Sequence, residues 1–167
     1  MRRRFNLMIA AIALFAGFLA NCGSTQNAAQ KEADAAKIRQ QIQNFNFTFN
    51  ATYAYPMGYR SIYLSPFYSV KVSQDTVKAY LPYYGRAYVA PMDPSQGGIN
   101  FTSTKFDYRV KEGKKNGNWM VEIKTKDTDR EILLNFDIWE NGSAKLDVTD
   151  PNRQSISFQG NISSEKK

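Results

Sequence analysis

Phe45-Asn46-Phe47-Thr48-Phe49-Asn50-Ala51-Thr52-Tyr53-Ala54-Tyr55 is the stretch that decides the fold class of this chain. Apolar or aromatic residues alternate in it with small residues, most of them polar, at a period of two. Because successive side chains of a β-strand point to opposite faces of a sheet, this period predicts a half-buried strand. We expect its aromatic residues to share one face, and Pro56-Met57-Gly58 to turn the chain at its end.

The same period recurs along the rest of the chain, in short segments separated by Gly, Pro, Asn and Asp residues. The segments that we expect to be strands are 59–64, 67–73, 76–81, 99–103, 106–111, 119–123, 132–138, 144–148 and 156–162. The last four are joined by short turns, and the pair Asn141-Gly142 favours a type I′ hairpin. Consecutive hairpins favour up-and-down order, and a count of about eight to ten strands suits a closed barrel or a two-sheet sandwich. We therefore expect an all-β fold, an antiparallel meander or barrel, with one α-helix before it.

That helix is predicted at about Ala28 to Asn44, with Asn27 as its N-cap. Its apolar stripe, which includes Ile38 and Ile42, is thin. A thin stripe packs against one surface only, so we expect the helix to lie across the sheet or the mouth of the barrel.

Residues 1–21 are typical of a secretory signal peptide. A basic start, Arg2-Arg3-Arg4, precedes an apolar run from Phe5 to Leu19. The run is shorter than the roughly 20 residues that a membrane-spanning helix needs.

Leu19-Ala20-Asn21-Cys22 resembles the lipobox of bacterial lipoproteins, although Asn21 stands where a small residue is usual. The resemblance implies that Cys22, the only cysteine, is acylated, which leaves no thiol for a disulfide or for catalysis. We divide the chain into a lipoprotein signal peptide (1–21), a tether (22–27), and a single β-barrel domain with its N-terminal helix (28–167). No acidic run follows Cys22, so we expect a protein anchored by lipid in the cell envelope, at the outer membrane and facing the periplasm.

The composition excludes several functions. The chain has no histidine, which removes Ser-His-Asp and Cys-His catalysis and histidine-ligated zinc. Asp127, Asp129 and Glu131 alternate like a cation loop but lack its following glycine, so a charged turn explains them. The formal charge of +7 falls to +4 without residues 1–21, and the basic residues are interleaved with acidic ones, so nucleic acid is not an expected partner. We expect a protein that is not an enzyme and that binds no cofactor and no metal. The remaining enzymatic alternative is a pair of carboxylates for glycoside cleavage, which can meet in the folded structure without a recognisable spacing in the sequence.

The segment Leu81-Pro82-Tyr83-Tyr84-Gly85-Arg86-Ala87-Tyr88-Val89-Ala90-Pro91 is the densest group of aromatic, Gly and Pro residues. A tyrosine offers a flat apolar face and a hydroxyl, which suit a sugar ring or a ligand pocket. The alternative is structural, since Tyr83, Tyr84 and Tyr88 can plug one end of a barrel. Arg86 stands among these rings and can stack on one of them or pair with a buried carboxylate.

Five features together resemble a family of bacterial lipoproteins classed as a domain of unknown function: the lipobox, the short helix, the Phe-rich first strand, the segment Leu81 to Tyr88, and the ending Ile156-Ser157-Phe158-Gln159-Gly160-Asn161-Ile162. The resemblance implies a lipocalin-like β-barrel with an N-terminal helix. It implies no activity, substrate or catalytic residue.

Two functional hypotheses follow for a membrane-anchored, non-enzymatic protein. In the first, a small apolar or amphipathic ligand lies inside the barrel or at its mouth, near Tyr83, Tyr84, Arg86 and Tyr88; a fully packed interior would contradict it. In the second, the aromatic loop docks to a glycan or to another protein of the envelope.

Overall fold

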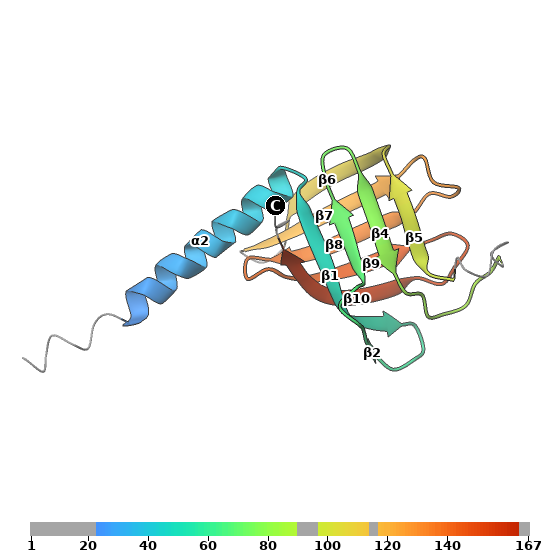
Figure 1. Cartoon of the computed structure of the whole chain (residues 1–167), viewed down its shortest axis with the longest axis horizontal. Helices are drawn as coiled ribbons and strands as arrows, with labels where there is room; N and C mark the ends of the chain where they lie inside the picture. Colours follow the sequence, from blue (N-terminus) through green and yellow to red (C-terminus); the bar gives the residue numbers. More distant parts are fainter. Residues whose placement is uncertain (1–22, 90–96, 114–116, 164–167) are drawn as a thin grey trace, which may run out of the picture. The chain divides into compact units, whose positions relative to one another are not determined.

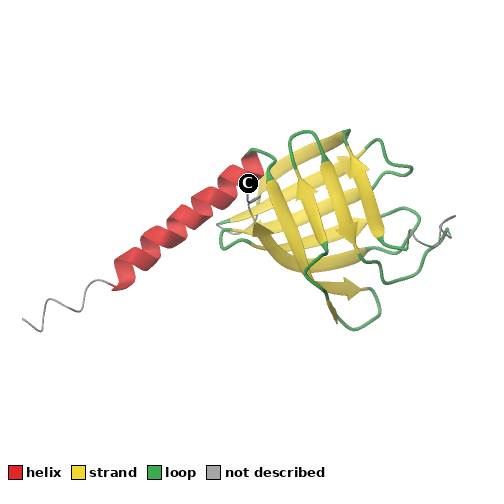
Figure 2. Ribbon diagram, viewed as in Figure 1, coloured by secondary structure: helices red, strands yellow, loops and turns green. Residues whose placement is uncertain are grey.

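The computed structural model describes residues 23–89, 97–113 and 117–163, with side chains from residue 28 onward. One helix is followed by ten strands (Figures 1 and 2). Their bounds are α2 Gly23–Gln43, β1 Phe47–Pro56, β2 Ile62–Tyr63, β3 Ser69–Val72, β4 Val77–Leu81, β5 Ile99–Ser103, β6 Phe106–Glu112, β7 Asn118–Thr125, β8 Leu133–Trp139, β9 Ser143–Thr149 and β10 Ile156–Ser163.

The strands form one antiparallel sheet that curls into a nearly closed barrel, as Figure 2 shows. The order around it is β5-β4-β3-β1-β10-β9-β8-β7-β6, and β2 pairs with the far half of β1. Two meanders, β1–β5 and β6–β10, are thus joined by the pair β1–β10. The predicted all-β barrel with one helix is confirmed. The barrel is open between β5 and β6, which are consecutive in the chain but not paired.

Strand β1 changes faces partway along its length. Phe47, Phe49 and Ala51 are buried, but after an irregularity between Ala51 and Tyr53 the buried residues are Ala54 and Pro56. Tyr53 and its neighbour two residues on, Tyr55, are therefore exposed. The prediction that all the aromatic residues of this strand share one face is wrong, because a β-bulge shifts the alternation by one residue.

Aromatic rings from opposite walls fill the interior of the barrel. Phe47 and Phe49 of β1 both meet the ring of Phe136 of β8, at centroid distances of 5.5 and 5.7 Å in edge-to-face geometry. Each of these rings is at most 2% exposed. Burial of a side chain of this size contributes about 2–3 kcal/mol to stability. Among the residues whose side chains are described, the buried apolar ones lie between Ile42 and Ile162.

The C-terminal part of α2 packs on this core. Ile42 is buried, and Ile38 is partly buried against it. The hydroxyl of Tyr108 donates a hydrogen bond of 2.8 Å to the carbonyl oxygen of Ile42, which satisfies one of the free carbonyls at a helix end. Burial raises the pKa of Tyr108.

The helix begins at Gly23, earlier than the predicted Ala28, so the segment expected as a tether (22–27) is helical from Gly23. Asn27 lies inside the helix and not at its N-cap. No proline interrupts the sequence between Gly23 and Gln43, and the helix extends through residues of only modest helix propensity.

The turn at Asn141-Gly142 also differs from the prediction. Gly142 has a φ of 79°, but among the described residues other than glycine only Phe45 has a positive φ, so the turn is not of type I′. The amide of Gly142 donates to the carbonyl of Trp139 (2.8 Å), and the amide of Ser143 donates to the side-chain oxygen of Asn141 (3.0 Å). Three residues separate β8 from β9, and a loop of this length usually ends on a left-handed glycine.

The signal peptide, Cys22 and most of the loop at 90–96 lie outside the described residues. Within the described part of the chain, no helix combines the length and apolar character needed to cross a membrane.

Candidate ligand-binding surface

The loop after β4 is fastened to the turn between β9 and β10. The amide of Gln154 donates to the carbonyl of Arg86 (3.0 Å), and the amide of Tyr88 donates to the carbonyl of Asn152 (2.8 Å). Between these contacts Ala87 and Arg153 form an isolated β-bridge. Residues 86–88 therefore have a fixed backbone even though they belong to no strand.

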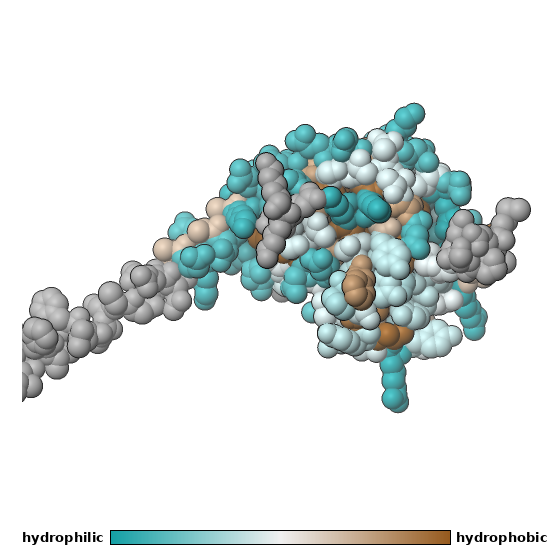
Figure 3. Space-filling view, in the orientation of Figure 1, coloured by the Kyte–Doolittle hydropathy of each residue, from teal (hydrophilic) through white to brown (hydrophobic). Residues whose placement is uncertain are grey.

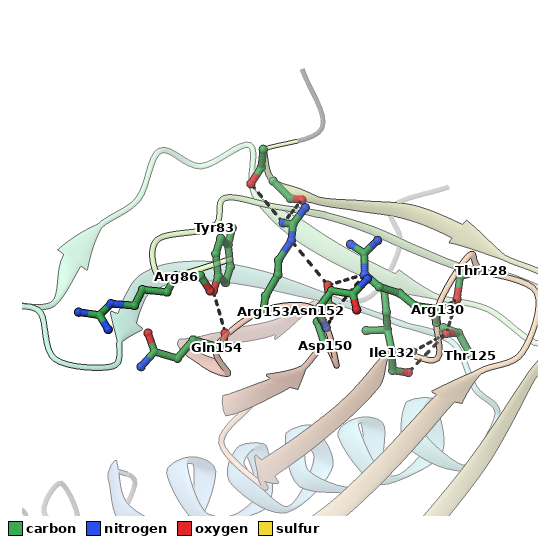
Figure 4. A network of polar contacts seen from close by, with 12 residues as sticks. Tyr83, Arg86, Thr125, Thr128, Arg130, Ile132, Asp150, Asn152, Arg153 and Gln154 are labelled. Atoms are coloured by element: carbon green, nitrogen blue, oxygen red, sulfur yellow. Dashed lines mark hydrogen bonds and ion pairs between the residues drawn. The ribbon is translucent and has the colours of Figure 1, made fainter. Parts of the chain in front are cut away.

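Tyr83 holds the beginning of this loop. Its hydroxyl lies 2.8 Å from the carbonyl oxygen of Arg86 and 3.0 Å from that of Gln154, as Figure 4 shows for the latter contact. The guanidinium of Arg153 lies over its ring, 5.0 Å from the centroid. Burial is the main reason why the pKa of Tyr83 is raised. Tyr83 thus serves the structural role that the sequence left open.

Beneath the loop, two arginines converge on one buried carboxylate (Figure 4). The Nε of Arg130 lies 2.7 Å from each oxygen of Asp150, and the Nε of Arg153 lies 3.7 Å from one of them. Arg153 also donates to the carbonyl oxygens of Gly97 and Gly98, at 3.2 and 2.8 Å. The side chains of Asp150 and Arg153 are only 6% and 5% exposed. The arginine that stacks on a tyrosine and pairs with a buried carboxylate is therefore Arg153, not Arg86.

Gly85 is required by the close approach of Tyr83. A Cβ atom at this position would lie 2.8 Å from the Tyr83 hydroxyl oxygen. Any larger residue would therefore push on the group that fastens the loop.

Three of the four predicted site residues remain on the outside of this fixed loop. Tyr84 is 37% exposed and Tyr88 is 69% exposed. Arg86 is exposed as well, and its side chain extends away from the network in Figure 4. Tyr84, Arg86 and Tyr88, which we call the loop surface, offer two aromatic rings and one cation to solvent.

The interior is a less suitable ligand site than the loop surface. Phe47, Phe49 and Phe136 occupy it in mutual contact, and Phe158 is also completely buried. This packing weighs against the first hypothesis where it places a ligand inside the barrel; a ligand at the mouth of the barrel is the other form of that hypothesis.

The charged turn that contains Asp127 and Asp129 is held by contacts with the loop between β5 and β6. The carboxylate of Asp127 accepts hydrogen bonds from the amides of Thr104 (2.8 Å) and Lys105 (3.0 Å), and from the hydroxyl of Ser103. These bonds, that of Ser103 above all, hold the pKa of Asp127 well below its usual range. In the described ranges, no three His, Cys, Asp or Glu side chains are grouped so that they could hold a metal ion.

A second exposed aromatic surface lies over β1, β2 and the turns beside them, and Figure 3 shows hydrophobic side chains in this region. Its most exposed members are Met57 (58%), Tyr59 (67%), Tyr63 (71%) and Phe67 (77%). This surface was not predicted. The concentration of tyrosine between residues 53 and 88 was the available signal, but the segment predicted as a strand at 59–64 is a strand only at Ile62–Tyr63, and the turns beside it leave these side chains in solvent.

Comparison with known proteins gives the family. The model of the family described as Domain of unknown function (DUF4251) matches residues 29–162. Among solved structures, the crystal structure of a DUF4251 family protein from Bacteroides eggerthii DSM 20697 at 1.95 Å resolution is similar, with a TM-score of 0.59 and 11% identity. The similarity covers 79% of this chain and 88% of that chain, and at this identity it shows the fold alone.

No curated protein matches the chain. The expected resemblance to a domain of unknown function is confirmed, whereas the lipoprotein character and the significance of residues 81–88 remain predictions. Because the family model spans most of the sequence, the chain belongs to the DUF4251 family.

Proposed function

We propose that the protein is a lipid-anchored, non-enzymatic binding module of the bacterial cell envelope, which binds a glycan through the loop surface. The observation that carries the proposal is the exposure of Tyr84, Arg86 and Tyr88 on a backbone fixed by hydrogen bonds to residues 152–154. A fixed backbone loses little conformational entropy when a ligand binds, so less of the binding free energy is spent on ordering the loop.

The chemistry of the loop surface suits a sugar. A tyrosine ring presents a flat apolar face for the C–H side of a pyranose, and its hydroxyl can exchange hydrogen bonds with sugar hydroxyls. Arg86 adds a planar cation, which favours glycans that carry a carboxylate or phosphate group. The lack of histidine supports a binding role over histidine-dependent catalysis.

A binding assay with envelope glycans tests the proposal. Isothermal titration would use soluble peptidoglycan fragments and acidic oligosaccharides of the outer membrane with the chain that starts at Gly23. We expect Tyr88→Ala to weaken binding at least tenfold, because the central aromatic contacts of an interface usually contribute 1–2 kcal/mol or more. Arg86→Ala should weaken binding of acidic glycans more than of neutral ones.

Tyr59→Ala is the matched control, because Tyr59 is exposed to nearly the same extent as Tyr88, at 67% against 69%, but lies outside the loop surface. It should leave glycan affinity unchanged. The proposed surface is wrong if the double variant Tyr84→Ala/Tyr88→Ala binds as well as the parent chain, and the glycan itself is wrong if the parent chain binds none of the panel.

The anchor is tested separately on the full chain. Cys22→Ser should abolish incorporation of labelled fatty acid and shift the protein from the membrane fraction to the soluble fraction. An unchanged acylated mass in the variant would rule out Cys22 as the anchor.

A further inference from the structure

The turns on either side of β2 carry apolar side chains that point to solvent. Met57 and Tyr59 lie between β1 and β2, Tyr63 lies in β2, and Phe67 lies between β2 and β3; each is more than half exposed. Together with the exposed Arg60 of the first turn, they form what we call the β2 tip. A cluster of this size on an outer surface indicates contact with another apolar phase.

The β2 tip is firmly held by the barrel. Tyr53 and Ala54 pair with Tyr63 and Ile62, and the amide of Leu64 donates to the carbonyl of Thr52 (2.9 Å). The rings of Tyr53 and Tyr63 meet edge to face, with their centroids 5.3 Å apart, and the side chain of Leu64 is buried in the hydrophobic core. The exposed residues are thus presented by a defined backbone.

The segment that forms the tip carries no carboxylate. From the start of β1 to the end of β3, residues 47–72, the sequence contains no Asp or Glu, and Arg60 stands among the exposed apolar side chains. The tip itself therefore presents a cation and no negatively charged side chain. Such a segment is complementary to anionic lipid head groups.

We propose that the β2 tip docks into the head-group region of a membrane that contains anionic lipid. Tyrosine is enriched at membrane–water interfaces because its ring is apolar and its hydroxyl remains hydrated. Met57 and Phe67 have no hydroxyl or amide for a sugar or a polar protein surface to bind, and they suit the acyl-chain boundary. Arg60 reaches a lipid phosphate while its stem stays among the rings.

Docking by the tip goes beyond the proposed glycan binding and does not depend on it, because the two surfaces share no residue. It gives the lipid anchor a second membrane contact, and two contacts hold a protein at a bilayer more firmly than either alone. The consequence is a preferred orientation of the barrel on the bilayer.

Vesicle flotation tests the inference with the chain that starts at Gly23, which lacks the anchor but retains every residue of the buried core. The vesicles contain either phosphatidylcholine alone or phosphatidylcholine with about one third phosphatidylglycerol. We expect the parent chain to float with the anionic vesicles, and the double variant Met57→Ser/Phe67→Ser to bind them at least tenfold more weakly. Arg60→Glu should weaken binding to the anionic vesicles but not to the neutral ones.

Tyr88→Ala is the control and should float like the parent chain. In the variant Phe67→Trp, tryptophan emission should shift to shorter wavelength when anionic vesicles are added, whereas Val110→Trp, at a site 38% exposed on β6, should not shift. The proposal fails if the parent chain does not float with either vesicle, or if Met57→Ser/Phe67→Ser floats as well as the parent. Equal thermal melts of parent and variants would show that lost binding is not lost folding.

Discussion

The buried carboxylate of Asp150 connects the segments that support the loop surface. Arg130 and Arg153 both point to it, and the amide of Asn152 donates to it at 2.9 Å. Arg153 in turn reaches the ring of Tyr83 and two carbonyl groups before β5. One buried negative charge thereby links the turn before β10 to the loop after β4.

Replacing that charge should destabilise the whole domain. We expect Asp150→Asn to lower the free energy of unfolding by about 3 kcal/mol, because two guanidinium groups lose their buried counter-charge. Urea denaturation of the parent and the variant measures the change. Asp129→Asn, at an exposed site in the neighbouring loop, is the control and should change stability by less than about 0.5 kcal/mol; equal midpoints for the two variants would show that the Asp150 network contributes little.

Single residues were the least predictable part of the site. The composition of residues 81–91 pointed to this loop as a candidate site, but nothing in it separates Tyr83, whose hydroxyl is bonded within the fold, from Tyr84 and Tyr88, which are exposed. Arg153 was missed because Asp150-Pro151-Asn152 has the ordinary composition of a turn. Which arginine pairs with which carboxylate depends on contacts between residues far apart in the chain, and local patterns do not report those.

At the scale of elements, the pair β1–β10 requires a glycine. Gly160 faces Ala51 beside the bulge, and a Cβ atom at Gly160 would lie 2.0 Å from the carbonyl oxygen of Asn50. The two backbones therefore approach more closely than any side chain allows. This contact explains why the ending Ile156 to Ile162 has a glycine in an otherwise alternating strand.

The variant Gly160→Ala should separate β1 from β10 locally. We expect a loss of about 2–3 kcal/mol in the free energy of unfolding, comparable to the cost of overpacking a core, since the atom in the way belongs to the backbone. Differential scanning calorimetry measures it. Gln159→Ala, at the exposed neighbouring position, should have a much smaller effect; a Gly160→Ala variant that melts with the parent would disprove the close approach.

Strands with a strict period were predictable, because their residues face one core. The buried positions of β8 and β9, and those of β7 from Trp119 onward, follow the alternation in the sequence. Strand β1 was predicted as a strand, but the faces assigned to its residues after Ala51 were wrong. One extra residue in a bulge does not change the composition of a strand, yet it moves every later side chain to the opposite face. The β2 tip was hidden for another reason: the segment predicted as a strand at 59–64 is a strand only at Ile62–Tyr63, and most of the exposed residues lie in the turns beside it.

At the scale of the whole molecule, Asp127 bridges the opening of the barrel. Its carboxylate accepts hydrogen bonds from Ser103, Thr104 and Lys105, which connect β5 to β6, while Asp127 itself lies in the loop after β7. Strands β5 and β6, on the two sides of the opening, are not paired. The bonds to Asp127 therefore connect the end of β5 and the loop after it to the loop that follows β7, where no strand pairing does so.

Asp127 should make stability depend on pH in acid. Its pKa is lower in the folded state than the value of about 4 expected in the unfolded chain, so its stabilising contribution is complete above about pH 4 and is lost as pH falls further toward the folded pKa. We expect Asp127→Asn to melt below the parent at pH 7, and the difference to shrink as the pH is lowered from 4. Thermal melts between pH 7 and pH 2 measure this, and a difference independent of pH would exclude the carboxylate as its source.

The meander order was predictable from the short turns, but the closure was not. Hairpin turns specify that β6 to β10 follow one another around the sheet. No local pattern indicates that β1 lies between β3 and β10, or that the neighbours β5 and β6 stand apart, because both facts arise from how the two meanders meet around the core.

That arrangement makes the barrel comparable to a complex of two subunits. Residues 47–103 and 106–163 each form a continuous half, and in the described sheet the only ladder between the halves is β1–β10, supplemented by the bridge from Ala87 to Arg153. Phe47 and Phe49 of one half meet Phe136 of the other as residues meet across an obligate interface. The linker at Thr104-Lys105 keeps the two halves close together but takes part in no strand pairing. A chain cut at this point would therefore keep every ladder of the sheet. Its two fragments would be expected to associate as complementary partners.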